Sequence, residues 1–255
     1  MARLYIVFLQ YAKCMEFQVS EIVETDMGTL LLPDNCITKV TYEEGRYNEY
    51  LLTERMRSVI ERDNKISLFV DIGANMGYYT RFASPYVENI LSIEASLENY
   101  MYFSSNTADI PNVTSLRCMA WNEDINGRLY KSHNHSGDYR SFGEGEVGSE
   151  ECPKLKLETI LRAYEAVAPI EEIVVKIDTQ GSDHIVLEGF GEYRDKVSNC
   201  FVECWPFGME RTDGSNINDI VKKYTEWGFE VLPIELPLTS INGDSYVNLH
   251  LRKNV

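Results

Sequence analysis

The sequence predicts an α/β protein with a mostly parallel sheet of seven strands, an antiparallel last hairpin, and helices on both faces. Two observations predict this class. Apolar runs of strand length alternate with helical runs along residues 66–234, which is the order of parallel strands joined by crossover helices. The first run includes Leu68, Phe69 and Val70 without polar alternation, as in a strand that is covered on both faces.

The elements follow one another in chain order. A helix from Tyr78 to Ala83 comes after the first strand, and it ends at Ser84-Pro85 because proline cannot donate the next amide hydrogen bond. A turn around Asn242-Gly243 makes the last two strands an antiparallel pair. The other predicted strands are 89–94, 113–120, 172–177, 199–203, 230–234 and 246–251, and the other predicted helices are 96–109, 157–167, 182–189 and 217–227.

The first 65 residues do not share this alternation. We expect residues 1–65 to form a small cap on a main domain that covers residues 66–255. The cap is predicted to hold a hairpin of strands 17–22 and 29–32 around Asp26-Met27-Gly28, followed by a helix over 50–62.

A polar insertion interrupts the main domain at residues 121–155. It is rich in Gly, Ser, Asn and His, and it is predicted to contain one short strand at 127–131. Connections of this length in compact domains are usually functional or disordered. We therefore expect the insertion to cover the ligand face.

Composition limits the kind of partner. The 255 residues carry 40 Asp and Glu against 24 Lys and Arg, for a formal net charge of −16. Nucleic-acid and anionic-membrane surfaces need clustered cations, so neither partner is expected. The apolar run at residues 4–12 is short and lacks a cleavage site, and no longer apolar stretch follows. We expect a soluble, cytoplasmic protein, and a homo-oligomer is possible.

The loop after the first strand has the composition of a nucleoside-cofactor site. Asp71 is followed by Gly73, Asn75 and Gly77, and the two glycines allow the backbone to turn sharply beside a ligand. Dinucleotide sites show G-x-G-x-x-G, whose middle glycine is missing here, so a nicotinamide dehydrogenase is disfavoured. An acid at the strand end repels phosphate and favours a cofactor with an amino group. The alternative is a turn that binds nothing.

Glu94 is the candidate partner of a ribose. It comes 23 positions after Asp71 (94 minus 71) and ends the second strand. A carboxylate at this point accepts hydrogen bonds from ribose hydroxyls. The alternative is an acid that only favours the start of the next helix.

Asp178 and Glu203 end two later strands and are the candidate acids of the reaction. Two carboxylates at adjacent strand ends can share a proton or a divalent cation, and a carboxylate, a histidine or a metal can assist attack by a hydroxyl. His184, one turn into the next helix, is the alternative base. Asp178 can instead serve only as an acceptor for amides at the helix start. Lys176 is expected to pair with an acid in the core.

Four further side chains are candidates for contact with a substrate. They combine polar atoms with large contact area, or lie in the insertion. The alternative for the histidines is a surface position, and for the aromatic residues ordinary packing. The four are His133, His135, Tyr139 and Trp205.

Three segments resemble class I S-adenosylmethionine-dependent methyltransferases, and more narrowly the FkbM family. They are FVDIGANMG at 69–77, SIEA at 92–95, and VKIDTQGSD at 175–183 with VLEG at 186–189. The third segment is the most specific. Gln180 and Asp183 stand where this family more often has Glu.

The resemblance implies a Rossmann-like sheet that binds S-adenosylmethionine, with a divalent metal left open. Asp178 would lie beside the methyl group. Asp71, Gly73, Asn75 and Gly77 would hold the methionine part, Glu94 with Ala95 the ribose, and Ala120, Trp121 and Asn122 the adenine.

The function that this resemblance implies is methyl transfer to an oxygen of a small molecule, sugar or natural-product intermediate. The acceptor would then be a small molecule or a glycan. The alternative is a non-catalytic cofactor-binding or scaffold subunit that keeps the methyltransferase fold, which agrees with the departures at Gln180 and Asp183.

Overall fold

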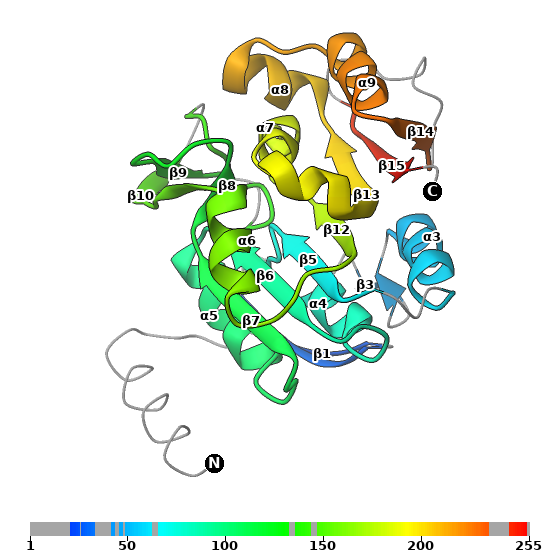
Figure 1. Cartoon of the computed structure of the whole chain (residues 1–255). Coiled ribbons are helices and arrows are strands. Elements are labelled where there is room, and N and C mark those ends of the chain that lie inside the picture. The colour runs from blue at the N-terminus through cyan, green and yellow to red at the C-terminus, as the bar shows by residue number, and fades with distance from the viewer. Residues whose placement is uncertain are drawn as a thin grey trace.

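The structure is a computed structural model of the chain. It describes residues 21–25, 27–33, 42–43, 46–47, 49–62, 66–132, 136–143, 147–234 and 245–253. Figure 1 shows the arrangement of the elements. The predicted turn at Asn242-Gly243 and the predicted strand residues 17–20 lie outside these ranges.

Seven strands form one mixed sheet in the order β14-β15-β13-β12-β5-β6-β7 (Figure 1). The strands from β7 to β13 in this order are all parallel, and β15 runs antiparallel between β13 and β14. The predicted mostly parallel sheet with an antiparallel last pair is therefore confirmed. The bounds are β5 Leu68–Ile72, β6 Ile90–Glu94, β7 Val113–Arg117, β12 Ile173–Ile177, β13 Val197–Cys204, β14 Phe229–Pro233 and β15 Val247–Lys253.

Helices cover both faces because every second residue of a strand points to the same side. Phe69 of β5 and Val174 of β12 pack with α3, α4 and α5, whereas their neighbours Val70 and Val175 pack with α6 to α9. The helices are α3 Tyr50–Ile60, α4 Tyr78–Ala83, α5 Leu97–Asn106, α6 Leu157–Glu165, α7 Asp183–Glu188, α8 Pro206–Asp213 and α9 Ile217–Glu226, with a 3₁₀ helix η1 at Gly191–Lys196. The sequence did not predict α8 and η1. In the described part of the chain, no helix is both long and apolar enough to cross a membrane.

The predicted strand over 113–120 is wrong in its second half. The main-sheet strand β7 ends at Arg117, and after Cys118 the chain begins a different strand, β8 Met119–Trp121. This strand pairs in parallel with β11, Lys154–Lys156, and the amide of Met119 donates to the carbonyl of Pro153 at 2.9 Å. The return of the insertion thus draws β8 away from the main sheet.

The insertion is more regular than its composition predicts. Its expected strand is confirmed as β9, Arg128–Lys131, and β10, Gly148–Glu151, pairs with it antiparallel. Figure 1 shows this hairpin at the edge of the molecule, and Leu129 of β9 packs with Met119 of β8. The insertion therefore carries two small sheets of its own.

The N-terminal hairpin packs on the sheet. The described strands β1, Glu21–Thr25, and β2, Gly28–Leu32, are antiparallel as predicted, and β3, Tyr42–Glu43, pairs with β4, Arg46–Tyr47. Leu30 and Leu32 are fully buried in the same apolar cluster as Leu52 and Met56 of α3 and Phe69 of β5. The hairpin and α3 thus share a core with the central strand.

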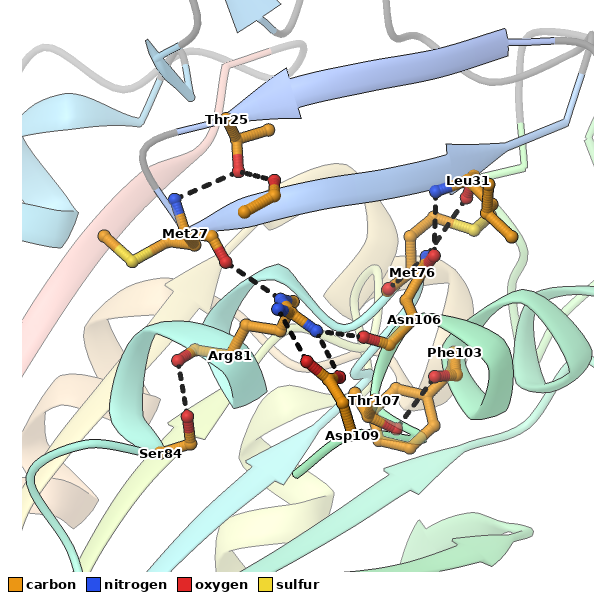
Figure 2. A network of polar contacts seen from close by, with 11 residues as sticks. Thr25, Met27, Leu31, Met76, Arg81, Ser84, Phe103, Asn106, Thr107 and Asp109 are labelled. Carbon is orange, nitrogen blue, oxygen red and sulfur yellow. Dashed lines mark hydrogen bonds and ion pairs between the residues drawn. The ribbon is translucent and has the colours of Figure 1, made fainter. Parts of the chain in front are cut away.

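Figure 2 shows the polar contacts that join the hairpin to α4 and α5. The side chain of Asn106, at the end of α5, accepts from the amide of Leu31 at 2.7 Å and donates to its carbonyl at 3.0 Å. The side-chain nitrogen of Asn106 also donates to the carbonyl of Met76 at 2.9 Å. Arg81 of α4 donates to the carbonyl of Met27 at 2.9 Å and pairs with Asp109 at 2.8 Å. Asn106 therefore fastens the loop after β5 to the hairpin.

Replacement of Asn106 by alanine should cost about 3 kcal/mol of unfolding free energy. Three backbone groups lose their partner, and an unpaired buried group costs about 1–3 kcal/mol. Urea unfolding measures the loss. Asp109→Ala is the control, because this side chain is 69% exposed and its ion pair should contribute at most about 1 kcal/mol. Equal losses in the two variants would contradict this account of Asn106.

Candidate functional site

A pocket opens at the carboxyl ends of β5, β6 and β12. The chain continues from β5 to β6 on one side, whereas β12 lies on the other side of β5, so the strand order reverses here. Ligands of open α/β sheets bind at such a point. The wall includes residues 73–76 after β5, residues 94–95 after β6 and residues 178–180 after β12.

The loop after β5 needs glycine for space as well as for conformation. Gly73, Asn75 and Gly77 all have positive φ, at 76°, 48° and 90°. A Cβ on Gly73 would lie 1.8 Å from the carbonyl oxygen of Asp178, which no other residue can accommodate. Asn75 is held in the left-handed region while its amide donates to Glu94 Oε2 at 2.8 Å. The sharp turn expected at Gly73 is present, but the group that Gly73 approaches closely is the backbone of Asp178, directly after β12, and not a ligand.

The loop after β12 has the same character. Gln180 and Gly181 have φ of 52° and 98°. The carboxylate of Asp183 accepts from the amides of Thr179 at 2.9 Å and Gly181 at 3.1 Å, and only 2% of Asp183 is exposed. Burial and the charge of Asp178 raise the pKa of Asp183 above its ordinary value. A buried carboxylate thus holds a strained turn, as occurs at ligand sites.

Asp178 projects into the pocket from this turn. Its Oδ2 accepts from Lys176 Nζ at 3.0 Å, and its Oδ1 accepts from Gln180 Nε2 at 2.8 Å. Lys176 is 2% exposed and its ammonium lies 5.0 Å from the ring centroid of Tyr79. Burial opposes the charge of Lys176, but the carboxylates of Asp178, Glu49 and Glu203 raise its pKa above the ordinary value. The predicted pairing of Lys176 with an acid is confirmed.

Glu94 lies on the pocket wall at the end of β6 and is 7% exposed. Its Oε2 accepts from the amide of Asn75 and its Oε1 from the amide of Ser96, both at 2.8 Å. A ligand hydroxyl that enters the pocket can therefore approach this carboxylate. Burial raises the pKa of Glu94 to about 7.

The far end of the pocket is more apolar. Ala95, Ala120 and Trp121 lie on its wall, as does Tyr139 from the insertion. The ammonium of Lys154 lies 3.5 Å from the ring centroid of Trp121, and burial lowers the pKa of Lys154. This end offers an aromatic and aliphatic surface of the kind that suits a planar ring.

Three predicted cofactor residues do not line the pocket. Asp71 is 1% exposed within β5, and its carboxylate accepts from Thr80 Oγ1 of α4 at 2.6 Å, because its position in the strand points it toward that helix. Burial raises the pKa of Asp71 to about 6. Gly77 faces Phe103 and Thr107, and Asn122 donates to Glu188 at 3.1 Å. These residues support the pocket loops from behind.

The structure does not bring His184 to the pocket wall. His184 is 2% exposed on α7, and its Nε2 lies 3.0 Å from Asp213 Oδ2 at the end of α8, so the ring points away from the pocket wall. The prediction that His184 acts as a base has no geometric support. His133 and His135 lie outside the described residues.

Trp205 and Glu203 lie beside the pocket and not on its wall. Trp205 packs on Phe207 with ring centroids 5.3 Å apart, and the Arg140 guanidinium lies 4.9 Å from its ring. Glu203 is 6% exposed and accepts from Gln180 Nε2 at 3.3 Å. Burial and the charge of Asp178 raise the pKa of Glu203 well above its ordinary value.

The sequence leaves a metal ion open and names Asp178 and Glu203 as the residues that could bind it. Both carboxylates already have nitrogen partners, since Lys176 and Gln180 donate to Asp178 and Gln180 also donates to Glu203. Among the described residues, no group of three or more His, Cys, Asp or Glu side chains is arranged to hold a metal ion.

Several polar atoms on the pocket wall are buried and lack a hydrogen-bond partner among the described residues. They are Asn75 Oδ1, Thr179 Oγ1, Asn99 Oδ1 and Ser136 Oγ. An unpaired buried polar group costs about 1–3 kcal/mol, so four of them around one pocket indicate a polar ligand. The sequence pointed to Asn75 alone, because the other three carry no motif of their own.

Comparison with known proteins finds distant structural likeness. No protein-family model and no curated protein sequence matches the chain. The chain is similar to a Streptococcus mutans protein described as a methyltransferase and solved with SAH, at 13% identity and a TM-score of 0.48, over 79% of this chain and 97% of that one. It is similar to methyltransferase FkbM from Methylobacillus flagellatus at 15% identity and a TM-score of 0.48, over 79% of this chain and 47% of that one. The chain is also similar to precorrin-6y C5,15-methyltransferase from Geobacter metallireducens at 11% identity and a TM-score of 0.47, over 88% of this chain and 94% of that one. With identities this low, function is inferred from the pocket residues.

Alanine at position 73 should be far more costly than alanine at another left-handed glycine. Gly214 has φ of 81° with no atom within 4 Å of an added Cβ, so Gly214→Ala should cost only the conformational penalty of about 1–2 kcal/mol. Gly73→Ala should cost at least twice as much, because β5 and β12 must separate. Urea unfolding of both variants compares them, and equal losses would contradict the close approach.

Glu94 should make the stability depend on pH. Its folded pKa of about 7 lies above the ordinary 4.5, so the folded state holds the proton more tightly. The stabilisation is therefore full below pH 4.5 and is lost as the pH rises toward 7. Relative to Glu94→Gln, the wild-type unfolding free energy should fall by about 3 kcal/mol across this window. Parallel stability curves for the two proteins would refute the buried position of this carboxylate.

Proposed function

We propose that the protein is an S-adenosylmethionine-dependent methyltransferase that acts on an oxygen atom. The observation that carries the proposal is the pocket at the reversal of strand order. Glu94 and Asp178 lie on its wall, together with buried polar atoms that have no partner among the described residues. The narrower assignment to the FkbM family rests on the segment 175–189 of the sequence.

The residues present fit this cofactor. Glu94 would accept hydrogen bonds from the ribose, and the adenine would lie against Ala120 and Trp121. Asn75 Oδ1 and Thr179 Oγ1 are buried acceptors without a described partner, and they suit the ammonium of a methionine part. Asp178 would face the positive sulfonium.

The charge of the pocket supports a cationic ligand over a phosphate. Of the described residues on the wall, Lys176 is the one cation, and its ammonium is already paired with Asp178. Glu49 adds a further carboxylate near that ammonium. A pyrophosphate would meet carboxylates here, whereas a sulfonium would be attracted to them.

Asp178 is the residue that we assign to proton removal. When bound, the cofactor supplies an electrophilic methyl group. Lys176 and Gln180 hold Asp178 in one orientation, because both donate hydrogen bonds to its carboxylate. A hydroxyl beside Asp178 can then pass its proton to the carboxylate as it attacks, while the pocket wall keeps it aligned.

The acceptor that we propose is a small molecule or a glycan with a free hydroxyl, such as a sugar or a natural-product intermediate. The net charge of −16 disfavours nucleic acid and an anionic membrane as partners. We also propose that the protein is cytoplasmic. A homo-oligomer is compatible with this function.

Substitution of Asp178 by asparagine should separate binding from turnover. Calorimetry should find S-adenosylhomocysteine affinity within about threefold of wild type, whereas transfer of labelled methyl to hydroxylated acceptors should fall at least about 100-fold. Asp213→Asn is the control, because Asp213 contacts His184 away from the pocket. A large loss of turnover in Asp213→Asn with little loss in Asp178→Asn would assign the base to His184 instead.

The wild-type protein also decides between an enzyme and a scaffold. Binding of S-adenosylmethionine with transfer to any acceptor of a hydroxylated panel supports the enzyme. Binding with no transfer across that panel, together with a tight protein partner, would identify the non-catalytic scaffold subunit. Absence of binding for both S-adenosylmethionine and S-adenosylhomocysteine would contradict the proposal.

A further inference from the structure

We propose that Asn99 and Ser136 are ribose-binding residues. Asn99 Oδ1 accepts a hydrogen bond from the vicinal diol of a nucleoside, and the hydroxyl of Ser136 bonds to the same diol. Residues 136–139, in the middle of the insertion, thereby close the nucleoside end of the pocket. This inference rests on the proposed cofactor. It has the insertion contact the cofactor, whereas the sequence alone predicts that residues of the insertion contact the substrate.

Asn99 lies in the first turn of α5, close behind Glu94. Ser96 begins this helix, and its side chain accepts from the amide of Asn99 at 3.3 Å. Asn99 is 3% exposed, and its side chain is close enough to Glu94 to lower the pKa of that carboxyl by hydrogen bonding, against the larger effect of burial. The two side chains therefore face the same part of the pocket.

The orientation of the Asn99 amide follows from its partner. Its Nδ2 donates to the carbonyl oxygen of Ser136 at 2.9 Å, and a carbonyl oxygen can only accept. The nitrogen must therefore face Ser136, which fixes the position of Oδ1. Within the described residues Oδ1 has no donor, although Asn99 lines the pocket. The atom is an open acceptor that a ligand can satisfy.

Ser136 supplies the complementary group from the insertion. It is 1% exposed, lines the pocket, and its hydroxyl has no hydrogen-bond partner in the described part of the chain. Nearby, Tyr139 and Ala95 pack against the small cluster of Met119, Leu129 and Cys152. The middle of the insertion is thus held at the end of the pocket where Ala95 and Ala120 lie.

The combination of these groups selects the ligand chemistry. Glu94 and Asn99 Oδ1 are acceptors, and the Ser136 hydroxyl can donate or accept. A vicinal diol brings two donors and two acceptors, so it can satisfy all three groups at once. A fully ionised phosphate group only accepts, so it would leave Asn99 Oδ1 unpaired beside a carboxylate. The geometry therefore favours the ribose of a nucleoside over a phosphorylated ligand.

Ser136→Ala tests the inference with two readouts. In the ligand-free protein, the Ser136 hydroxyl has no partner among the described residues, so its removal should leave the melting temperature unchanged or slightly raised. Calorimetric titration with S-adenosylhomocysteine should show affinity about 3- to 10-fold weaker than wild type. A purely structural serine would lower the melting temperature instead. The matched control is Ser149→Ala on β10, since this insertion hydroxyl is exposed and bonds to Arg128 at 3.0 Å; its affinity should not change.

A second titration uses the 2′-deoxy and 3′-deoxy forms of S-adenosylhomocysteine. If the Ser136 hydroxyl bonds to the diol, one of these two ligands lacks the hydroxyl that Ser136 contacts. That ligand should bind equally to wild type and Ser136→Ala, because it cannot form the hydrogen bond with either protein. Equal affinity of wild type, Ser136→Ala and Ser149→Ala for unmodified S-adenosylhomocysteine would overturn this inference and leave the proposed function standing. Failure of the wild type to bind S-adenosylhomocysteine would overturn both.

Discussion

The site depends on the close approach of β5 and β12 at their carboxyl ends. The amide of Asp178 donates to the carbonyl of Ile72 at 2.9 Å, so the two strands stay paired up to the point where both chains turn. The carbonyl of Asp178 then occupies the space in which Gly73 would carry a Cβ. The two loops therefore diverge from a shared contact, and the pocket is the space between them and the end of β6.

Each of these loops is held by a buried carboxylate. The loop after β5 is fixed by Glu94, which accepts from the amides of Asn75 and Ser96, and the loop after β12 is fixed by Asp183, which accepts from those of Thr179 and Gly181. Burial raises the pKa of both groups. In each loop a residue other than glycine is in the left-handed region, and the carboxylate offsets that strain. Charge and backbone conformation thus depend on each other at this site.

The sequence was sufficient for the main sheet because its signals are local. The alternation of apolar strands and amphipathic helices specified the parallel strands, and glycines at 73 and 77 marked the loop. The end of β7 was not predictable, since the switch of Met119 to another sheet depends on Lys154, a residue 35 positions away (154 minus 119). The N-terminal hairpin was predictable as a hairpin, but its attachment through Asn106 depends on a contact that spans 75 positions.

The site was predictable in part for the same reason. Gly73, Asn75, Glu94, Ala95, Ala120, Trp121, Tyr139 and Asp178 all lie on the pocket wall. Asp71 and His184 do not, because the direction of a side chain depends on its packing partner, Thr80 in one case and Asp213 in the other. The sequence did not predict Asn99 and Ser136, because each is identified by a buried polar atom that has no partner among the described residues, and such an atom has no signature in a sequence.

A crystal structure of the protein with S-adenosylhomocysteine tests the central claim most directly. The account predicts the ribose within hydrogen-bond distance of Glu94, the base against Ala120 and Trp121, and the sulfur facing Asp178. A ligand bound elsewhere, or one whose ribose points away from Glu94, would contradict it.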